Sequence, residues 1–249
     1  MEDKQTKSDP QTEFQNEKSN NEQWCFSYYA GNELADSNQR AVLLKNTQWN
    51  AGDKITISFM DGDPAIQKKV KDVAMEWIET GMANLTFEFS TNTKDTDIRI
   101  SFQFSGSWSV LGTTCKKIPK DKPTMNLGWL KSNTPPDELR RVVLHEFGHA
   151  IGLIHEHMNP AEGGIKWNKP QVEKDLSGPP NNWSPDVIFN NMFKTFADSE
   201  LKLTAVDSKS IMMYPIPAKW TLDGFNVVLN TDLSDTDKKF VREIYPGND

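Results

Sequence analysis

The chain has 249 residues, of which 36% are hydrophobic and 25% are charged, and these figures fit one large globular domain or two small ones. No run of about eighteen apolar residues occurs, so no membrane-spanning helix is expected. The net charge of −7 argues against a nucleic-acid or anionic-membrane partner, because such a surface needs a basic stripe. The two cysteines, Cys25 and Cys115, permit one disulfide or two free thiols.

The first 40 residues differ in composition from the rest of the chain. Residues 1–23 are almost wholly polar and cannot bury enough apolar surface to offset the entropy of an ordered chain. The chain does not begin with a basic and then apolar secretion signal, which leaves a cytosolic protein or one whose signal has been removed. A short aromatic cluster follows and suggests docking onto the rest of the molecule: Trp24, Phe26, Tyr28 and Tyr29. We therefore expect residues 1–40 to form a partly disordered N-terminal segment.

Alternating apolar residues predict three half-buried strands, near residues 55–59, 85–89 and 98–104. A helix is expected between the first two strands. Asp63 can cap this helix, Pro64 suits its first position and Gly81 can close it. Its apolar residues keep the spacing of one helical face: Ile66, Val70, Val73, Ala74, Trp77 and Ile78.

A second helix is expected from Thr134-Pro-Pro-Asp137, which resembles a capping box, to about Ile151. The segment after it is rich in Pro, Asn and Gly and is expected to be irregular, as far as a helix from Ser184-Pro185 to about Phe196. A last helix is expected to begin near Ser234.

The four histidines of the chain all lie within the sequence H-E-F-G-H-A-I-G-L-I-H-E-H, which begins at His145. His145 and His149 are four residues apart, so they point the same way from a helix and can hold one Zn²⁺. Gly152 tolerates a positive φ, so the helix can end there and the chain can turn to bring His155 back as a third ligand. The alternative is a set of ordinary helix-surface histidines, and the added glycine and third histidine argue against it.

Three protein ligands leave one coordination position open for water, which is typical of a catalytic zinc ion rather than a structural one. Glu146 lies next to the ligands, where it can accept a proton from water as the water attacks a carbonyl. The fourth histidine, His157, has no expected role beyond a structural hydrogen bond.

The histidine pattern, followed by Ser210-Ile-Met-Met-Tyr214, resembles the metzincin peptidases with their Met-turn. Met212 would then form an apolar floor under the zinc site, whereas a methionine pair by itself would suggest ordinary core. Glu156 directly after the third histidine, together with the Ser-x-Met-x-Tyr pattern, resembles the astacins in particular. The resemblance extends over residues 40 to about 245.

The resemblance to astacins implies an α+β, zincin-like metzincin fold. A twisted, mixed, five-stranded sheet with two long helices would lie over an irregular C-terminal subdomain that ends in a helix. Residues 1–40 would be a pro-segment and residues 41–249 the catalytic domain, with an upper subdomain over 41–152 and a lower subdomain over 153–249. The active-site helix would cross between the two, with Gly152 at the passage.

The same resemblance implies roles for further residues. Tyr214 would be an extra zinc ligand at rest and would stabilise the oxyanion in the transition state. Residues 106–112 are similar to the astacin edge strand onto which a peptide substrate adds antiparallel, so Trp108 and Ser109 are candidate substrate contacts, with core packing as the alternative for Trp108. Cleavage between Arg40 and Ala41 would free an amino terminus that is buried near Glu156; otherwise Arg40 is one exposed arginine among many.

The chain also departs from the animal astacins, and the departures point to a bacterial-type relative. The two disulfides of their catalytic domain are absent, since only Cys115 lies in that region, and Ser107 stands where a cysteine is common. The F-x-G-D pattern by which the family's pro-segment blocks zinc is replaced by Tyr29-Ala-Gly-Asn32, whose neutral side chain is a poor zinc ligand. Cys25 offers a thiolate instead, as a cysteine switch. A disulfide with Cys115, or two unconnected thiols, remain alternatives.

These observations favour a secreted zinc endopeptidase that binds one Zn²⁺ and stays latent until a second protease removes its pro-segment. The expected partners are protein or peptide substrates and the activating protease, with no nucleic acid, and the expected state is a monomer. Two other classes remain open. A zinc amidase acting on small molecules or cell-wall peptides would share the same chemistry, and a non-catalytic zinc-binding module would not need Glu146.

Overall fold

The computed structural model describes residues 25–28, 47–160, 164–179, 181–194 and 206–248, and of residues 25–28 it describes the backbone alone. Arg40 and Ala41 lie outside the described residues, as does most of the expected pro-segment. Within the described chain, none of the helices is both long and apolar enough to cross a lipid bilayer.

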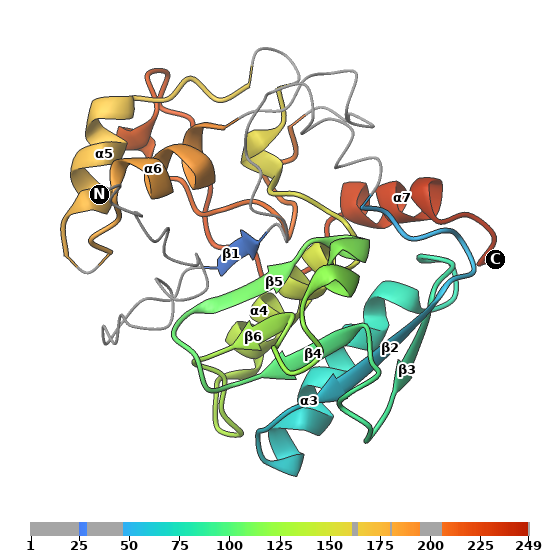
Figure 1. Cartoon of the computed structure of the whole chain (residues 1–249). Coiled ribbons are helices and arrows are strands. Elements are labelled where there is room, and N and C mark those ends of the chain that lie inside the picture. The colour runs from blue at the N-terminus through green and yellow to red at the C-terminus, as the bar shows by residue number, and fades with distance from the viewer. Residues whose placement is uncertain (1–24, 29–46, 161–163, 180, 195–205, 249) are drawn as a thin grey trace, which may run out of the picture.

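Five strands of the expected catalytic domain form one mixed, twisted sheet, as predicted (Figure 1). The spatial order is β5-β6-β4-β2-β3, and β1 joins it as a sixth strand at the edge beside β5. All neighbouring pairs are parallel except β5 and β6, which are antiparallel. The bounds of the strands are Cys25–Tyr28 for β1, Lys54–Phe59 for β2, Thr86–Phe89 for β3, Ile98–Ser101 for β4, Ser107–Val110 for β5 and Met125–Leu127 for β6.

The first expected helix is present as α3 (Pro64–Ala74), followed by a 3₁₀ turn over Met75–Ile78. As predicted, Asp63 caps it, since its side chain accepts hydrogen bonds from the backbone amides of Ala65 and Ile66. The long helix α4 (Pro136–Ala150) packs against α3 and against strands β5 and β6. The expected cap at Thr134 is wrong, because the Thr134 hydroxyl accepts from the Lys131 amide and Pro135 precedes the helix without a side-chain cap.

The C-terminal half contains α5 (Lys169–Ser177), α6 (Pro185–Ile188), a π-helical turn over Phe189–Phe193 and α7 (Asp235–Ile244). Helix α5 falls in the segment that was expected to be irregular. The expected helix after Ser184 is short and passes into the π-helical turn, which ends before Lys194. Ser234 caps α7 through a capping box with Asp237, close to the predicted start.

Buried apolar side chains form two clusters. The first lies between the sheet and helices α3 and α4, and α7 adds Val241 and Tyr245 to it. The second lies among α5, α6 and residues 213–227, and Trp129 packs against both clusters. The chain passes from one cluster to the other between Met212 and Met213. The division into subdomains at residue 152 stays a prediction.

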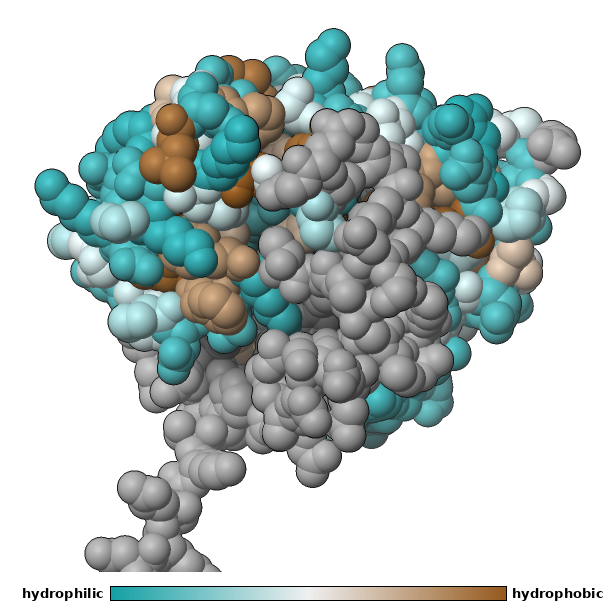
Figure 2. Space-filling view, turned by 90° about the horizontal axis from the view of Figure 1, so that it is seen from above, coloured by the Kyte–Doolittle hydropathy of each residue, from teal (hydrophilic) through white to brown (hydrophobic). Residues whose placement is uncertain are grey.

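Where described residues are visible from above, the surface is mostly hydrophilic, with hydrophobic residues in small groups (Figure 2). Large hydrophobic side chains that are exposed in the described chain are Phe189, Leu222, Val228 and Leu229.

Candidate metal centre

Helix α4 positions the first two histidines and the glutamate between them. Pro136 occupies the first turn of the helix, and Asp137 and Glu138 place negative charge at its N-terminus. The apolar residues of its last turns belong to the first apolar cluster, and His145, Glu146 and His149 are buried with them. The helix therefore holds three polar side chains at depth, where they need partners or a bound ion.

The turn after α4 depends on Gly152, whose φ of +101° is accessible mainly to glycine. A Cβ atom at this position would find its nearest neighbour, the Tyr245 hydroxyl, at 3.6 Å, so the requirement is conformational rather than one of space. The Gly152 amide donates to the His149 carbonyl and the Leu153 amide donates to the Gly148 carbonyl, which closes the helix. The chain then returns and places His155, fully buried, next to His149.

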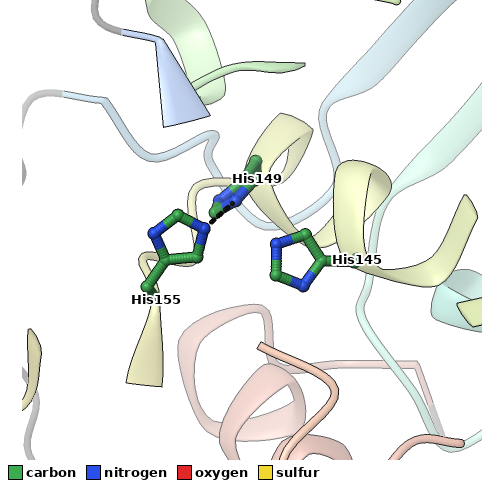
Figure 3. A group of neighbouring side chains, drawn as sticks. All are labelled: His145, His149 and His155. Carbon is green, nitrogen blue, oxygen red and sulfur yellow. Dashed lines mark hydrogen bonds between the residues drawn. The ribbon is translucent and has the colours of Figure 1, made fainter. Parts of the chain in front are cut away.

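The three histidines converge, as the sequence predicted (Figure 3). One ligand nitrogen from each lies within 4.8 Å of the others. The Nδ1 atoms of His145 and His149 lie 2.8 Å from the backbone carbonyls of Ile211 and Leu153, which fixes both rings. An N–H on each Nδ1 leaves the lone pair of each Nε2 directed away from the backbone, toward the centre of the group.

The polar atoms at the centre fit a metal ion. Burial lowers the pKa of all three imidazoles, that of His149 to about 4, so the rings are neutral near pH 7 and can act as ligands. His145 Nε2 is buried without a hydrogen-bond partner among the described residues. The Nε2 atoms of His149 and His155 face each other at 3.0 Å, where two lone pairs would repel unless a proton or cation lies between them. The triad could therefore hold a metal ion, and nitrogen ligands of this kind suit zinc.

Residues 210–214 lie against α4 and form hydrogen bonds at or next to two of the three histidines. The Ile211 carbonyl accepts the hydrogen bond from His145, and the Met212 carbonyl accepts from the amide of Glu156, next to His155. The Met212 side chain is buried against the helix, because a Cβ atom added to Gly148 would lie 2.4 Å from Met212 Sδ. Met212 thus packs against the histidine helix, and its role as the floor of a zinc site stays a prediction.

Tyr214 is buried beside the histidine group. The centroid of its ring lies 4.3 Å from that of His155 and 6.0 Å from that of His145. His157 stacks on the same tyrosine, with centroids 4.8 Å apart and planes at 27°, and its Nε2 lies 2.7 Å from the Asn191 carbonyl. The expected structural hydrogen bond of His157 is therefore present, whereas its contact with Tyr214 is not visible from the sequence.

Two solved structures, both of myroilysin, are similar to the chain. The first is 41% identical, with 82% of this chain and 98% of that chain covered and a TM-score of 0.78. The second is 36% identical, with 97% and 98% covered and a TM-score of 0.66. The chain belongs to the myroilysin family.

The likeness to myroilysin, together with the mixed sheet and the helices, confirms the predicted metzincin-type α+β fold. No protein-family model matches the chain, and the search of curated proteins found no match. The resemblance to astacins in particular therefore rests on the residue patterns in the chain.

In this myroilysin-family fold, the predicted edge strand is β5, and it carries both candidate substrate contacts. Trp108 is half-buried, and Ser109 is buried with its hydroxyl donating to the Val110 carbonyl at 3.2 Å. One edge of β5 pairs with β6, and the other pairs with β1, where Phe26 and Ser27 lie opposite Trp108 and Ser109. The N-terminal segment thus occupies the edge that was expected to receive a substrate.

Glu156, which is partly buried, is the residue for which an amino-terminal partner was expected. Its carboxylate accepts hydrogen bonds from the Asn159 side chain at 3.1 Å and from the Asp207 amide at 3.0 Å. Burial raises its pKa to about 7, and the nearby carboxylates of Asp237 and Asp207 act in the same direction.

Cys25 lies in β1, and Cys115 lies in the 3₁₀ turn Gly112–Lys117 that follows β5. Cys25 is paired through its backbone with Ser107 at the start of β5, and its side chain lies outside the described atoms. Cys115 is a buried free thiol in the turn after β5.

Proposed function

We propose that the protein is a zinc-dependent endopeptidase that hydrolyses peptide bonds in proteins. The observation that carries the proposal is the convergence of three buried, neutral imidazoles beside one buried glutamate at the end of α4. The likeness to myroilysin and the histidine triad together support a zinc-dependent protease. A non-catalytic zinc-binding module would not need Glu146, so a buried glutamate next to the triad argues against that alternative.

Zinc bound by His145, His149 and His155 would polarise the scissile carbonyl and lower the pKa of a water molecule. Glu146, one residue further round the helix than His145, would accept the proton of the attacking water and return it to the leaving amine. Tyr214, whose ring contacts His155, would donate its hydroxyl to the oxyanion. Each of these roles is assigned to a buried side chain.

The test of this proposal separates metal binding from hydrolysis. Glu146→Ala should keep one zinc ion per chain, measured by atomic absorption, and should lose at least about 100-fold of the activity on casein, as expected for removal of a general base. Asp137→Asn, at an exposed position in the first turn of the same helix, is the matched control and should change neither value. Normal turnover by the Glu146 variant would refute the mechanism. Activity on small amides or cell-wall peptides but not on casein would favour the amidase alternative.

Latency is supported by the position of β1. A substrate that extends the sheet at β5 in the astacin manner runs antiparallel to that strand, whereas β1 runs parallel to it. Strand β1 therefore occupies the edge of β5 that a substrate would use, and it runs in the direction opposite to that of a substrate. A substrate cannot pair with this edge while β1 is in place. We expect limited proteolysis at Arg40–Ala41 to release activity from a secreted proenzyme. Arg40→Gln should resist trypsin at that bond and remain latent, as N-terminal sequencing and a casein assay can establish.

We expect a mature terminus at Ala41 to reach Glu156. The side chain of Gln48 and its Cα lie within 4 Å of the Cβ position of Gly152, at the turn that leads to Glu156. Residues 41–46 can extend about 20 Å from Thr47, at roughly 3.3 Å per residue. An ammonium group would give the partly buried Glu156 carboxylate a partner of opposite charge. Glu156→Gln should therefore lower the stability of the cleaved enzyme more than that of the full chain, measured by thermal unfolding of both forms.

The candidate zinc switch is Cys25. Its backbone lies opposite Ser107, one residue before Trp108 on the substrate edge. Cys115 is a free thiol rather than one half of a disulfide, which leaves Cys25 available as a zinc ligand. Thiol titration of the full chain should find Cys25 protected with zinc and reactive after chelation, while Cys25→Ser should raise the basal activity. An oxidised pair of cysteines would exclude the switch.

A further inference from the structure

His157 is a buried aromatic side chain at the metal centre that is not one of its three ligands. It lies in the 3₁₀ turn Glu156–Met158, two residues after His155. Its Nε2 lies 2.7 Å from the backbone carbonyl of Asn191, in the π-helical turn Phe189–Phe193. This hydrogen bond holds the imidazole to a part of the fold that is separate from the histidine helix.

The ring of His157 packs between Tyr214 and Trp167. It stacks on Tyr214 with centroids 4.8 Å apart and meets Trp167 edge to face at 6.0 Å. Tyr214 in turn lies 4.3 Å from His155. The tyrosine ring is therefore in contact with a ligand imidazole and with a second imidazole that is itself fixed from behind by Trp167 and Asn191.

Only one of the two ring nitrogens of His157 forms a hydrogen bond among the described residues. Since a backbone carbonyl only accepts, Nε2 carries the proton, and Nδ1 is left as an acceptor. Nδ1 is buried without a hydrogen-bond partner among the described residues. A glutamine or asparagine could donate to Asn191 equally well, so the distinctive contribution of histidine here is its flat ring.

We propose that His157 is a positioning residue that holds the ring of Tyr214 against His155, and so fixes where the tyrosine hydroxyl can reach. This rests on the proposed role of Tyr214 in hydrolysis. A side chain that must donate to a short-lived oxyanion works best when its ring is held in place beforehand, because misplacement by about 1 Å is costly. His157 supplies that constraint through ring contact and its anchor on Asn191.

The experiment compares two replacements that separate the ring from the hydrogen bond. His157→Gln keeps a donor for Asn191 and removes the ring, and it should lower kcat about tenfold with KM nearly unchanged, an effect expected for lost orientation. His157→Phe keeps the ring and loses the donor, and it should retain kcat within about threefold while its Tm falls. Both should keep one zinc ion per chain, measured by atomic absorption.

A double-mutant cycle with Tyr214→Phe tests whether His157 affects kcat through the tyrosine hydroxyl. If His157 acts through the tyrosine hydroxyl, His157→Gln should add little to the loss already caused by Tyr214→Phe. An equal loss in both backgrounds, or a Phe variant that loses kcat as much as Gln does, would overturn the positioning role. Full activity of Tyr214→Phe alone would instead overturn the role of Tyr214 itself, and with it this proposal. If the Gln variant does not fold, His157→Asn and His157→Phe make the same comparison.

Discussion

The carboxylate of Asp237 accepts a hydrogen bond from the backbone amide of Ile211 at 2.8 Å. Asp237 lies in the first turn of α7, and it also accepts from the Ser210 hydroxyl at 2.6 Å. The carbonyl of Ile211 then accepts from His145. The start of the C-terminal helix is thus connected to His145, a residue of the candidate metal centre, through Ile211.

Replacing Asp237 should therefore disturb the metal centre as well as the fold. Asp237→Asn keeps the size of the side chain but puts an amide N–H₂ opposite either the Ile211 amide or the Ser210 hydroxyl. We expect the free energy of unfolding to fall by about 1–3 kcal/mol and zinc affinity to fall several-fold, as for a residue that orients a ligand. Chemical denaturation and chelator competition measure the two effects.

The matched control for this variant is Asp235→Asn, in the same turn of α7 with an exposed side chain. It removes one negative charge from the helix N-terminus without touching residues 210–214, and should cost at most about 1 kcal/mol. Equal zinc affinity in the two variants would show that Asp237 acts on stability alone.

Local features of the fold were predictable from the sequence because their causes are local. Asp63 and Ser234 cap their helices through contacts within three residues, and Gly152 turns the chain through its own φ. The spacing of His145, His149 and His155 was enough to predict their convergence. The fold class followed from these motifs, and the structural likeness confirms it.

Features that depend on distant contacts were not predictable. The strand expected over 98–104 ends at Ser101, because Asp61 accepts from the Ser101 hydroxyl and the Phe102 amide and draws the chain out of the sheet. Helix α5 was not predicted because it buries just two residues, Val172 and Leu176, which are too few to give a clear helical periodicity of apolar residues.

The missed site residues escaped prediction for the same reason. The contact of His157 with Tyr214 joins positions far apart in the chain. The hydrogen bond from Ile211 to Asp237 does so too, and the acidic capping residue carries no local sign that it also holds a turn elsewhere. The spacing of residues in the sequence predicts contacts between neighbours on one helix, whereas both of these contacts join separate segments of the chain.

Gly148 in the histidine helix should not tolerate a side chain. A Cβ atom there would lie 2.4 Å from Met212 Sδ and 3.3 Å from the Trp77 ring. Alanine would improve helix propensity by about 1 kcal/mol, yet overpacking in a core costs about 1–3 kcal/mol, so the clash should win. We expect Gly148→Ala to lower both Tm and zinc affinity, measured by calorimetry and chelator competition. Adding Met212→Ala to Gly148→Ala should recover part of the zinc affinity. A Gly148→Ala variant as stable as the parent would contradict the predicted clash with Met212.

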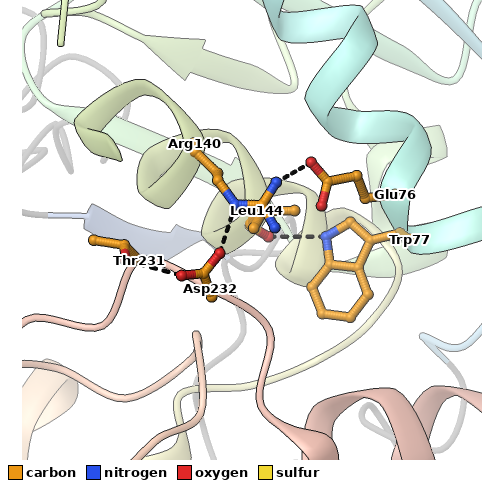
Figure 4. A network of polar contacts seen from close by, with 6 residues as sticks. All are labelled: Glu76, Trp77, Arg140, Leu144, Thr231 and Asp232. Atoms are coloured by element: carbon orange, nitrogen blue, oxygen red, sulfur yellow. Dashed lines mark hydrogen bonds and ion pairs between the residues drawn. The ribbon is translucent and has the colours of Figure 1, made fainter. Parts of the chain in front are cut away.

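Arg140 joins three segments on the other side of α4 (Figure 4). Its guanidinium pairs with Glu76, in the turn after α3, and donates to Asp232, before α7, at 2.8 Å. Asp232 is 71% exposed whereas Glu76 is 23% exposed, so the pair with Glu76 should contribute more. We expect Arg140→Ala to cost about 1–2 kcal/mol and Asp232→Asn less than about 0.5 kcal/mol, with zinc content unchanged in both. Urea denaturation at low and high salt measures this; a larger loss for Asp232→Asn would reverse the order.

Cys115 should be inert in the native protein and should make stability depend on pH in the alkaline range. Burial raises the pKa of its thiol to about 12, and the nearby Asp97 carboxylate acts in the same direction. Because the thiolate is the reactive form, alkylation of the folded Cys25→Ser variant at pH 8.5 should be negligible and should become rapid in denaturant.

The sign of the pH effect follows from the same shift. The folded chain holds the Cys115 proton more tightly than the unfolded chain, whose thiol has a pKa near 9.0. The free energy of unfolding therefore has this contribution in full below pH 9 and loses it as the pH rises toward 12, by at most about 1.4 kcal/mol per pH unit. The difference in unfolding free energy between Cys25→Ser and Cys25→Ser/Cys115→Ala, measured from pH 7 to 11, isolates the term from other groups that titrate there. A difference that stays constant across this range would show that the buried thiol titrates no differently from that of the unfolded chain.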